Sequence, residues 1–176
     1  DDNLVQFRIK TLPGHFTESP TYIILVDSTP PQNPSQVSSS SHTISRWSND
    51  RTIDMQWSGA SDATSGLFGY SYVWDTSAST LPPEISNTTG NQTTSQPLAD
   101  GNAYWFHIRT RDQARNWSPD AVHRGPYSID ATSPTNPTSL SSPSHQVGEW
   151  SKDNTIEVTW NAGADALSGV GGYSIV

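Results

Sequence analysis

The sequence predicts an all-β protein built from tandem two-sheet sandwich units, and two observations support that fold class. The first is an internal repeat: residues 29–73 align without a gap onto residues 132–176, and 22 of these 45 positions are identical. The second is the apolar pattern, which comes in short alternating runs separated by Pro, Ser and Asn. A self-similarity of this length indicates a tandem array of similar units.

The phase of the repeat divides the chain into three parts. The offset between the copies is 103 residues, so residues 28–130 make one complete unit of ordinary domain size. We expect residues 1–27 to supply the last two strands of a preceding unit and residues 131–176 the first three strands of a following one. Each partial unit should expose apolar surface that neighbouring repeats of the same chain, or identical subunits in a fibre, complete.

Seven strands are expected in the complete unit. Three of them alternate clearly, at residues 52–57, 70–74 and 104–109. Each places one apolar set on one face, as a half-buried sheet requires: Ile53, Met55 and Trp57; Tyr70, Tyr72 and Trp74; Tyr104, Phe106 and Ile108. The other four are expected within residues 122–129 and near 35–39, 81–85 and 93–98. Seven short strands in about 100 residues predict a sandwich of two sheets.

A proline-containing linker precedes each copy. Residues 27–34 (DSTPPQNP) correspond to residues 130–137 (DATSPTNP). Proline fixes φ and favours extended, stiff connections, so the units should form a semi-rigid string. The chain begins Asp1-Asp2-Asn3, which is neither an initiator Met nor a signal peptide, and we expect a mature or internal segment.

One stretch of the complete unit resembles a known family. Leu98-Ala99-Asp100-Gly101-Asn102-Ala103-Tyr104, followed by Phe106 and Ile108, resembles the tyrosine corner of fibronectin type III domains. Residues 111–118 (RDQARNWS) resemble a loop of bacterial and archaeal cell-surface versions, with Arg115 in place of a Gly. The resemblance implies tandem seven-stranded Ig-like (fibronectin type III-like) β-sandwiches. The core residues that it implies are Trp57, Tyr70, Leu98, Tyr104, Phe106 and Ile108, with Trp160 and Tyr173 in the following unit.

Composition and motifs argue against several function classes. A formal charge of −8 and a pI near 4.8 argue against binding nucleic acid or anionic membranes. The chain has no Cys, and no apolar run approaches the roughly 18 residues that cross a membrane. The five His residues show no metalloprotease spacing, and nucleophile-elbow and phosphate-loop motifs are absent. We therefore expect neither an enzyme nor direct membrane insertion.

Two groups of residues are candidate metal ligands. Asp62 and Asp112 are expected in loops at one end of the sandwich, beside Asp27 of the linker, where carboxylates from several loops could hold calcium and stiffen the joint. The alternative, which the sequence favours, is that these Asp residues shape turns by bonding their own backbone. His107 and His123 lie on adjacent expected strands and could face one another. Surface packing is the preferred interpretation of that pair over a metal site.

Surface features add three sequons and several aromatic residues. Asn87, Asn91 and Asn116 each begin an Asn-X-Ser/Thr acceptor sequence in an expected loop. Trp47, Trp105 and Trp117 lie off the expected core faces, where they could stack surface glycans. Such residues more often cover strand edges or contact a neighbouring domain.

The expected function is structural. A tandem array joined by stiff linkers fits a segment of a large extracellular cell-surface or filament-forming protein, such as a stalk, adhesin shaft or fibre. The alternative is a carbohydrate- or protein-binding module, or a spacer attached to a secreted hydrolase.

Overall fold

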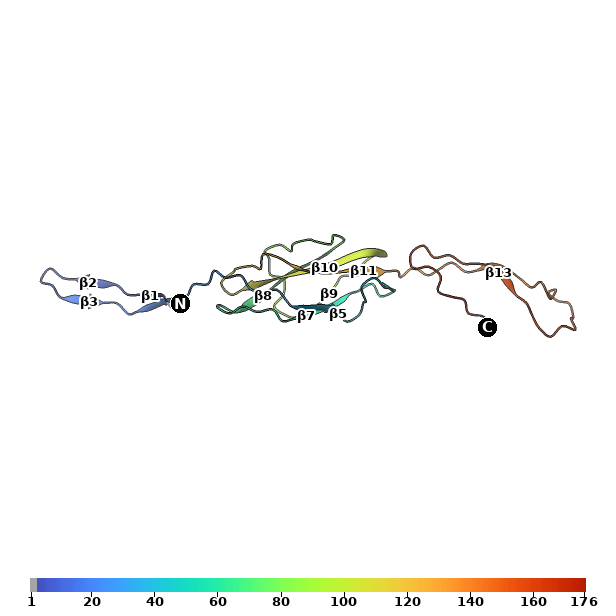
Figure 1. The fold of residues 1–176 in the computed structure, drawn as a ribbon, viewed down its shortest axis with the longest axis horizontal. Coiled ribbons are helices and arrows are strands. Elements are labelled where there is room, and N and C mark those ends of the chain that lie inside the picture. Colours follow the sequence, from blue (N-terminus) through green and yellow to red (C-terminus); the bar gives the residue numbers. More distant parts are fainter. Residues whose placement is uncertain (1–2) are drawn as a thin grey trace.

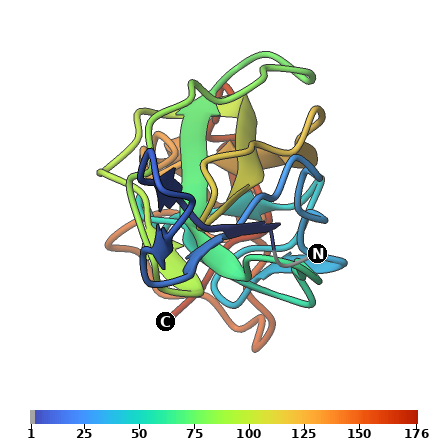
Figure 2. The same ribbon diagram turned by 90° about the vertical axis from the view of Figure 1, so that its left-hand side faces the viewer.

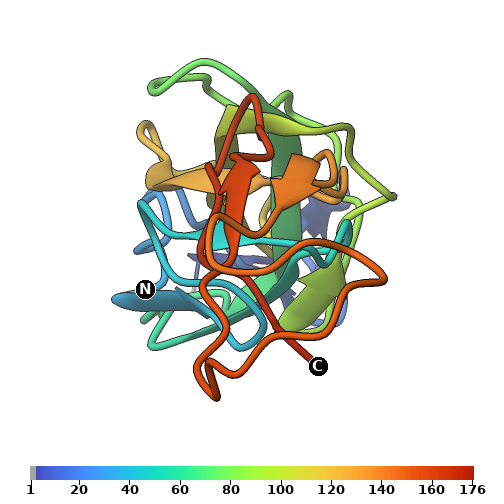
Figure 3. The same ribbon diagram turned by 90° about the vertical axis from the view of Figure 1, so that its right-hand side faces the viewer.

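The computed structural model describes residues 3–176, which form thirteen β-strands and no helix. The chain is extended: a central body is flanked by a thinner segment on each side along one long axis (Figure 1). Views along that axis place the N-terminal segment in front of the body from one side (Figure 2) and the C-terminal segment in front from the other (Figure 3). The fold class is therefore all-β, and the described residues contain no helix that could cross a membrane.

The central body holds two sheets. One has the strand order β5–β7–β9 and the other β6–β11–β10–β8. The strands of the first are β5 (Gln36–Ser39), β7 (Asp54–Ser58) and β9 (Gln92–Thr94). Those of the second are β6 (Trp47–Ser48), β11 (Val122–Ile129), β10 (Gly101–Asp112) and β8 (Leu67–Asp75). All neighbours are antiparallel except β6, which runs parallel to β11.

Both sheets contribute to one hydrophobic core. Its fully buried members are Val37, Ile53, Met55, Trp57, Phe106, Ile108, Tyr127 and Ile129. Trp57 of the first sheet stacks on Phe106 of the second with ring centroids 5.9 Å apart, and Tyr70 meets Trp57 edge-on at 5.5 Å. Two sheets sharing one core in this way are consistent with a β-sandwich.

The residues expected to form the core lie in or against it. Trp57, Phe106 and Ile108 are buried, and the partly buried Tyr70, Leu98 and Tyr104 pack against the cluster. The Tyr104 hydroxyl donates a hydrogen bond to the Ala99 carbonyl at 2.9 Å, which ties β10 to the loop before it.

The ring pair of the core recurs one unit later. Trp160 and Tyr173 meet edge-on with centroids 5.4 Å apart, as Trp57 and Tyr70 do at 5.5 Å. The local packing of the repeat is thus kept even where the opposite sheet is not among the described residues.

One expected strand in the complete unit is absent, and one observed strand was not predicted. Residues 81–85 form no strand; they belong to the loop between β8 and β9, in which Pro82 is fully buried. Pro82 and Pro83 lack the backbone N–H that a ladder needs, which explains the difference. Strand β6, only two residues long, was not predicted because such a length shows no periodicity.

The N-terminal segment is one long hairpin. Strand β1 (Asn3–Val5) pairs with β4 (Tyr22–Ile24), and β2 (Arg8–Lys10) pairs with β3 (Phe16–Glu18). Its apolar side chains are exposed, including Phe7, Ile9, Ile23 and Ile24. The hairpin therefore offers an uncovered sheet face to whatever lies beside it.

The C-terminal segment pairs β12 (Thr138–Ser141) with β13 (Thr159–Asn161). The third strand expected in residues 131–176 is absent, because residues 170–176 form no ladder. Their counterparts in the central body, residues 67–73, are held by pairing with β10, and residues 131–176 contain no equivalent of β10.

Candidate functional site

The joint before the central body is built around the linker residue Asp27. Its Oδ1 accepts a hydrogen bond from the Thr29 N–H at 2.9 Å, and its Oδ2 accepts one from the Ser65 N–H at 3.1 Å. Hydrogen bonds from the Ser65 hydroxyl and from the Thr29 backbone hold the pKa of the Asp27 carboxyl below its ordinary value. One charged side chain thus fastens the linker to the loop after β7.

That loop is shaped by Asp62. Its Oδ1 accepts backbone N–H groups of Thr64, Ser65 and Gly66 at 3.1, 2.9 and 2.8 Å. Gly66 has a φ of 80°, a left-handed conformation that favours glycine, and its counterpart Gly169 has the same φ. The favoured interpretation of Asp62, a turn-forming side chain, describes what its carboxylate does here.

The third carboxylate, Asp112 at the end of β10, is fully buried. It accepts the Asn116 backbone N–H on Oδ1 and the Asn116 side-chain Nδ2–H on Oδ2, both at 2.7 Å. The same Nδ2 also donates to the Asp27 carbonyl at 3.1 Å. Asn116 therefore ties the turn after β10 to the linker.

These three Asp residues converge on one point. One carboxylate oxygen from each of Asp27, Asp62 and Asp112 lies within 4.8 Å of the others. The structure brings together the two residues predicted as calcium ligands and the linker Asp expected beside them. Hydrogen bonds to loop backbone account for their positions, and calcium binding stays a prediction.

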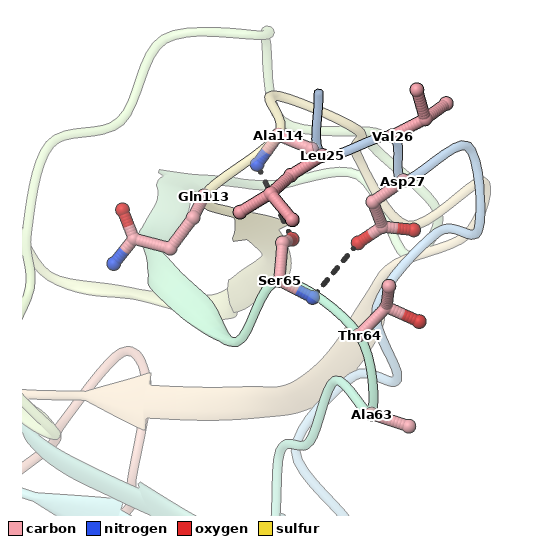
Figure 4. A pocket seen from close by; sticks show the side chains of 8 residues that line it. All are labelled: Leu25, Val26, Asp27, Ala63, Thr64, Ser65, Gln113 and Ala114. Carbon is pink, nitrogen blue, oxygen red and sulfur yellow. Dashed lines mark hydrogen bonds between the residues drawn. The ribbon is translucent and has the colours of Figure 1, made fainter. Parts of the chain in front are cut away.

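A cleft of about 630 Å³ opens beside this joint. It is lined by Leu25, Val26, Asp27, Ala63, Thr64, Ser65, Gln113 and Ala114 (Figure 4). Two hydrogen bonds cross it: the Ser65 N–H donates to Asp27, and the Ala114 N–H donates to the Ser65 hydroxyl at 3.3 Å. Ser65 thus links both loops to the incoming chain through its backbone N–H and its hydroxyl, a role that its recurrence as Ser168 could have indicated.

The next joint repeats this geometry. The Ser168 N–H donates to Asp130 Oδ2 at 2.9 Å, and the Thr132 N–H donates to Asp130 Oδ1 at 3.3 Å. The Ser168 hydroxyl is the main cause that lowers the pKa of Asp130, as the Ser65 hydroxyl is for Asp27. Two consecutive joints therefore share the contacts of this Asp with a Ser and a Thr, displaced by one unit.

Asn33 anchors the far end of the linker. Its Oδ1 accepts hydrogen bonds from the Thr110 N–H at 3.0 Å, the Thr110 hydroxyl at 3.2 Å and the Ser118 hydroxyl at 2.7 Å. Its Nδ2 donates to the Asp120 carbonyl at 2.7 Å. Thr110 and Ser118 are buried, so Asn33 satisfies polar groups that water does not reach. This role of Asn33 was not predicted from the sequence, although Asn33 recurs as Asn136.

A calcium ion held by the three Asp residues would stabilise the joint, and Asp62→Asn separates this role from turn formation. An Asn side-chain oxygen still accepts the three backbone hydrogen bonds, but one negative charge is lost. At a free calcium concentration of 100 times Kd, a bound ion adds about 2.7 kcal/mol of stability. If calcium binds, the unfolding temperature of the native chain rises with calcium concentration, and that of Asp62→Asn rises much less. Equal behaviour of the two proteins would contradict calcium binding.

The three sequons differ in how free their amides are. Asn116 donates two hydrogen bonds through Nδ2, and Asn87 bonds the Tyr72 N–H and carbonyl at 3.0 and 2.9 Å. Asn91 is exposed, and among the described residues its amide has no hydrogen-bond partner. Only at Asn91 does an attached glycan leave the described hydrogen bonds intact.

We therefore expect Asn91 to carry the glycan when the chain is secreted folded from a host with N-glycosylation. Peptide mapping should show occupancy at Asn91 and little at Asn116, and Asn91→Gln should remove most of the added mass. Full occupancy of Asn116 in folded protein would contradict this expectation.

The exposed aromatic residues are partly covered. The Arg109 guanidinium lies 5.0 Å from the Trp117 ring centroid, and Arg111 lies 5.8 Å from it. Trp105 packs on Gly125, where an added Cβ would come within 2.8 Å of the indole. These contacts reduce the ring surface that a sugar could stack on, and they favour a packing role for both residues.

The histidines fall into two kinds. His42 bonds the Ser41 hydroxyl through Nδ1 and the Asp50 carbonyl through Nε2, and His145 repeats this pattern with Ser144 and Asp153. The recurring His thus fixes a loop through bonds to a Ser hydroxyl and an Asp carbonyl.

The second kind is the pair formed by His107 and His123. These side chains face one another across β10 and β11, with the two Nδ1 atoms 2.6 Å apart. The expectation of surface packing is wrong for His107, which is fully buried.

Comparison of the chain with protein-family profiles, curated proteins and solved structures found no match.

Proposed function

We propose that this chain is a structural segment of a large extracellular cell-surface or filament-forming protein, such as a stalk, adhesin shaft or fibre. Its units would be tandem seven-stranded Ig-like sandwiches similar to fibronectin type III domains. The two sheets of the central body, the ring packing of Trp57 and the hydrogen bond from Tyr104 to Ala99 support that assignment. The extended arrangement of the three parts supports a role as a spacer (Figure 1).

The recurring joint is the observation that carries this proposal. Asp27 with Ser65, and Asp130 with Ser168, make the same hydrogen bond one unit apart. A linker that is bonded at its start and contains proline has few conformations, so each unit holds its neighbour in a defined direction. When every joint carries this hydrogen bond, a series of domains stays extended and stiff, as a shaft requires.

A chain of one, two or three tandem copies of residues 28–130 tests the proposal. The junction of Asp130 with Ser28 recreates the sequence of the first joint. We expect the maximum dimension from small-angle X-ray scattering to grow in proportion to copy number. Replacing Asp130 by Ala at each junction should shorten the mean dimension and broaden its distribution. Growth typical of a flexible chain in the unaltered series would overturn the proposal.

A further inference from the structure

We propose that His107 and His123 form a binding site for a divalent transition-metal ion such as Zn²⁺, with the ion held between their Nδ1 atoms. The site lies on neighbouring strands of the four-stranded sheet, where the register places the two residues directly opposite each other. It is separate from the Asp residues of the joint.

The Nδ1 atom of His107 faces the Nδ1 atom of His123. The Nδ1 atoms are 2.6 Å apart, so one of them must carry a proton for the contact to be a hydrogen bond. A metal ion can take the place of that proton, because neutral imidazole is a good ligand for zinc, copper and nickel. Zinc–nitrogen bonds of about 2.0–2.1 Å in tetrahedral geometry require the two nitrogens to be about 3.3 Å apart. A small rotation of the partly exposed His123 ring provides that separation.

Asp75 fixes the orientation of the His107 ring. Its Nε2 lies 3.1 Å from Asp75 Oδ1, and the oxygen of an ionised carboxylate can only accept a hydrogen bond. Nε2 of a neutral His107 therefore carries the proton, and the lone pair of Nδ1 points toward His123. A carboxylate that fixes the far nitrogen of a ligating His is the usual outer support of a metal site. The Asp75 charge also favours a nearby cation.

The pair is accessible to an ion from one side only. His107 has no exposed surface, but His123 is partly exposed, so an ion can enter from the His123 side and use water for its remaining positions. Arg109 is the nearest cationic residue along β10. Its guanidinium contacts the Trp117 ring, and the Arg109 Nη1 lies 3.8 Å from Glu84 Oε1.

The other histidines do not offer an equivalent pair. Both ring nitrogens of His42 and of His145 are engaged by Ser and backbone groups. His15 is exposed in the N-terminal hairpin, and the chain has no Cys to compete for zinc. Binding at the His107–His123 pair is therefore separable from background by single substitutions.

Isothermal titration of the full chain with Zn²⁺ in chelator-free buffer with excess Ca²⁺ tests the proposal. Long-range ¹H–¹⁵N spectra of the imidazoles report which nitrogen atoms are affected. We expect one ion per chain and a shift of the Nδ1 signals of His107 and His123. His123→Gln should weaken binding at least tenfold, and Asp75→Asn should weaken it by about 10- to 100-fold. His15→Gln, which removes an isolated imidazole, should leave the affinity unchanged.

Hydrogen exchange of β10 amides in each variant checks that the sandwich remains folded, and His123 is chosen over the buried His107 for this reason. Absence of zinc binding to the native chain would overturn the proposal. So would unchanged affinity in a folded His123→Gln protein, or zinc-induced shifts confined to other histidines.

Discussion

Replacing Trp57 by alanine is expected to lower the free energy of unfolding of the central sandwich by about 3–5 kcal/mol. Trp57 is 3% exposed and contacts the rings of Phe106, Tyr70 and Tyr72 across the core. Its removal leaves a cavity between the sheets that the remaining side chains fill only in part. Native-state hydrogen exchange of β7 and β10 amides measures this loss in the full chain, because these amides report on the central sandwich alone.

Trp150→Ala is the matched control for this substitution. Trp150 is fully exposed, so the same change in side chain should alter stability by no more than about 0.5 kcal/mol. A loss below about 1 kcal/mol for Trp57→Ala would show that this ring is not central to the core.

Asn33→Ala should lower the free energy of unfolding by about 1–3 kcal/mol. The Asn33 oxygen is shared by Thr110 and Ser118, both buried, and its loss leaves their donors without that acceptor. Urea denaturation followed by circular dichroism measures the change, and the exchange rate of the Thr110 amide locates it.

The repeat provides the control at Asn136. This residue occupies the same place in the following linker but is exposed and makes no hydrogen bond among residues 3–176. Asn136→Ala should leave stability within about 0.5 kcal/mol of the native chain. Equal losses at both positions would point to an intrinsic linker preference instead of the buried hydrogen bonds.

The sequence predicts most of the central body because its strands alternate. The inward set of β10, Tyr104, Phe106 and Ile108, follows from period two alone, and so does the core position of Trp57. The loop at residues 81–85 was not predictable in this way, because Leu81 and Ile85 are exposed and the buried residue is Pro82, which cannot donate to a ladder. Strand β6 is specified by its tertiary contact with β11 and not by local pattern.

Prediction of the joint was partial for a different reason. The turn after β7 and the position of Asp112 beside it follow from the order of strands, so the meeting of the carboxylates could be expected. The bonds of Asn33, and the bond from Asn116 to Asp27, connect residues 77 to 89 positions apart, and no local rule specifies such partners. Recurrence within the chain was the available signal, since Asn33 and Ser65 both reappear in the second copy.

The Asp–Ser contact that both joints share has a geometric consequence for the proposed array. When each unit is related to the next by the same rotation and translation, the array follows a screw axis, and one joint determines pitch and handedness for any number of units. A substitution at Asp27 alters one junction, but a change present in every copy, such as the loss of each Ser65 equivalent, adds the same angular error at each step. Over many units, a deviation of a few degrees bends or unwinds the whole assembly.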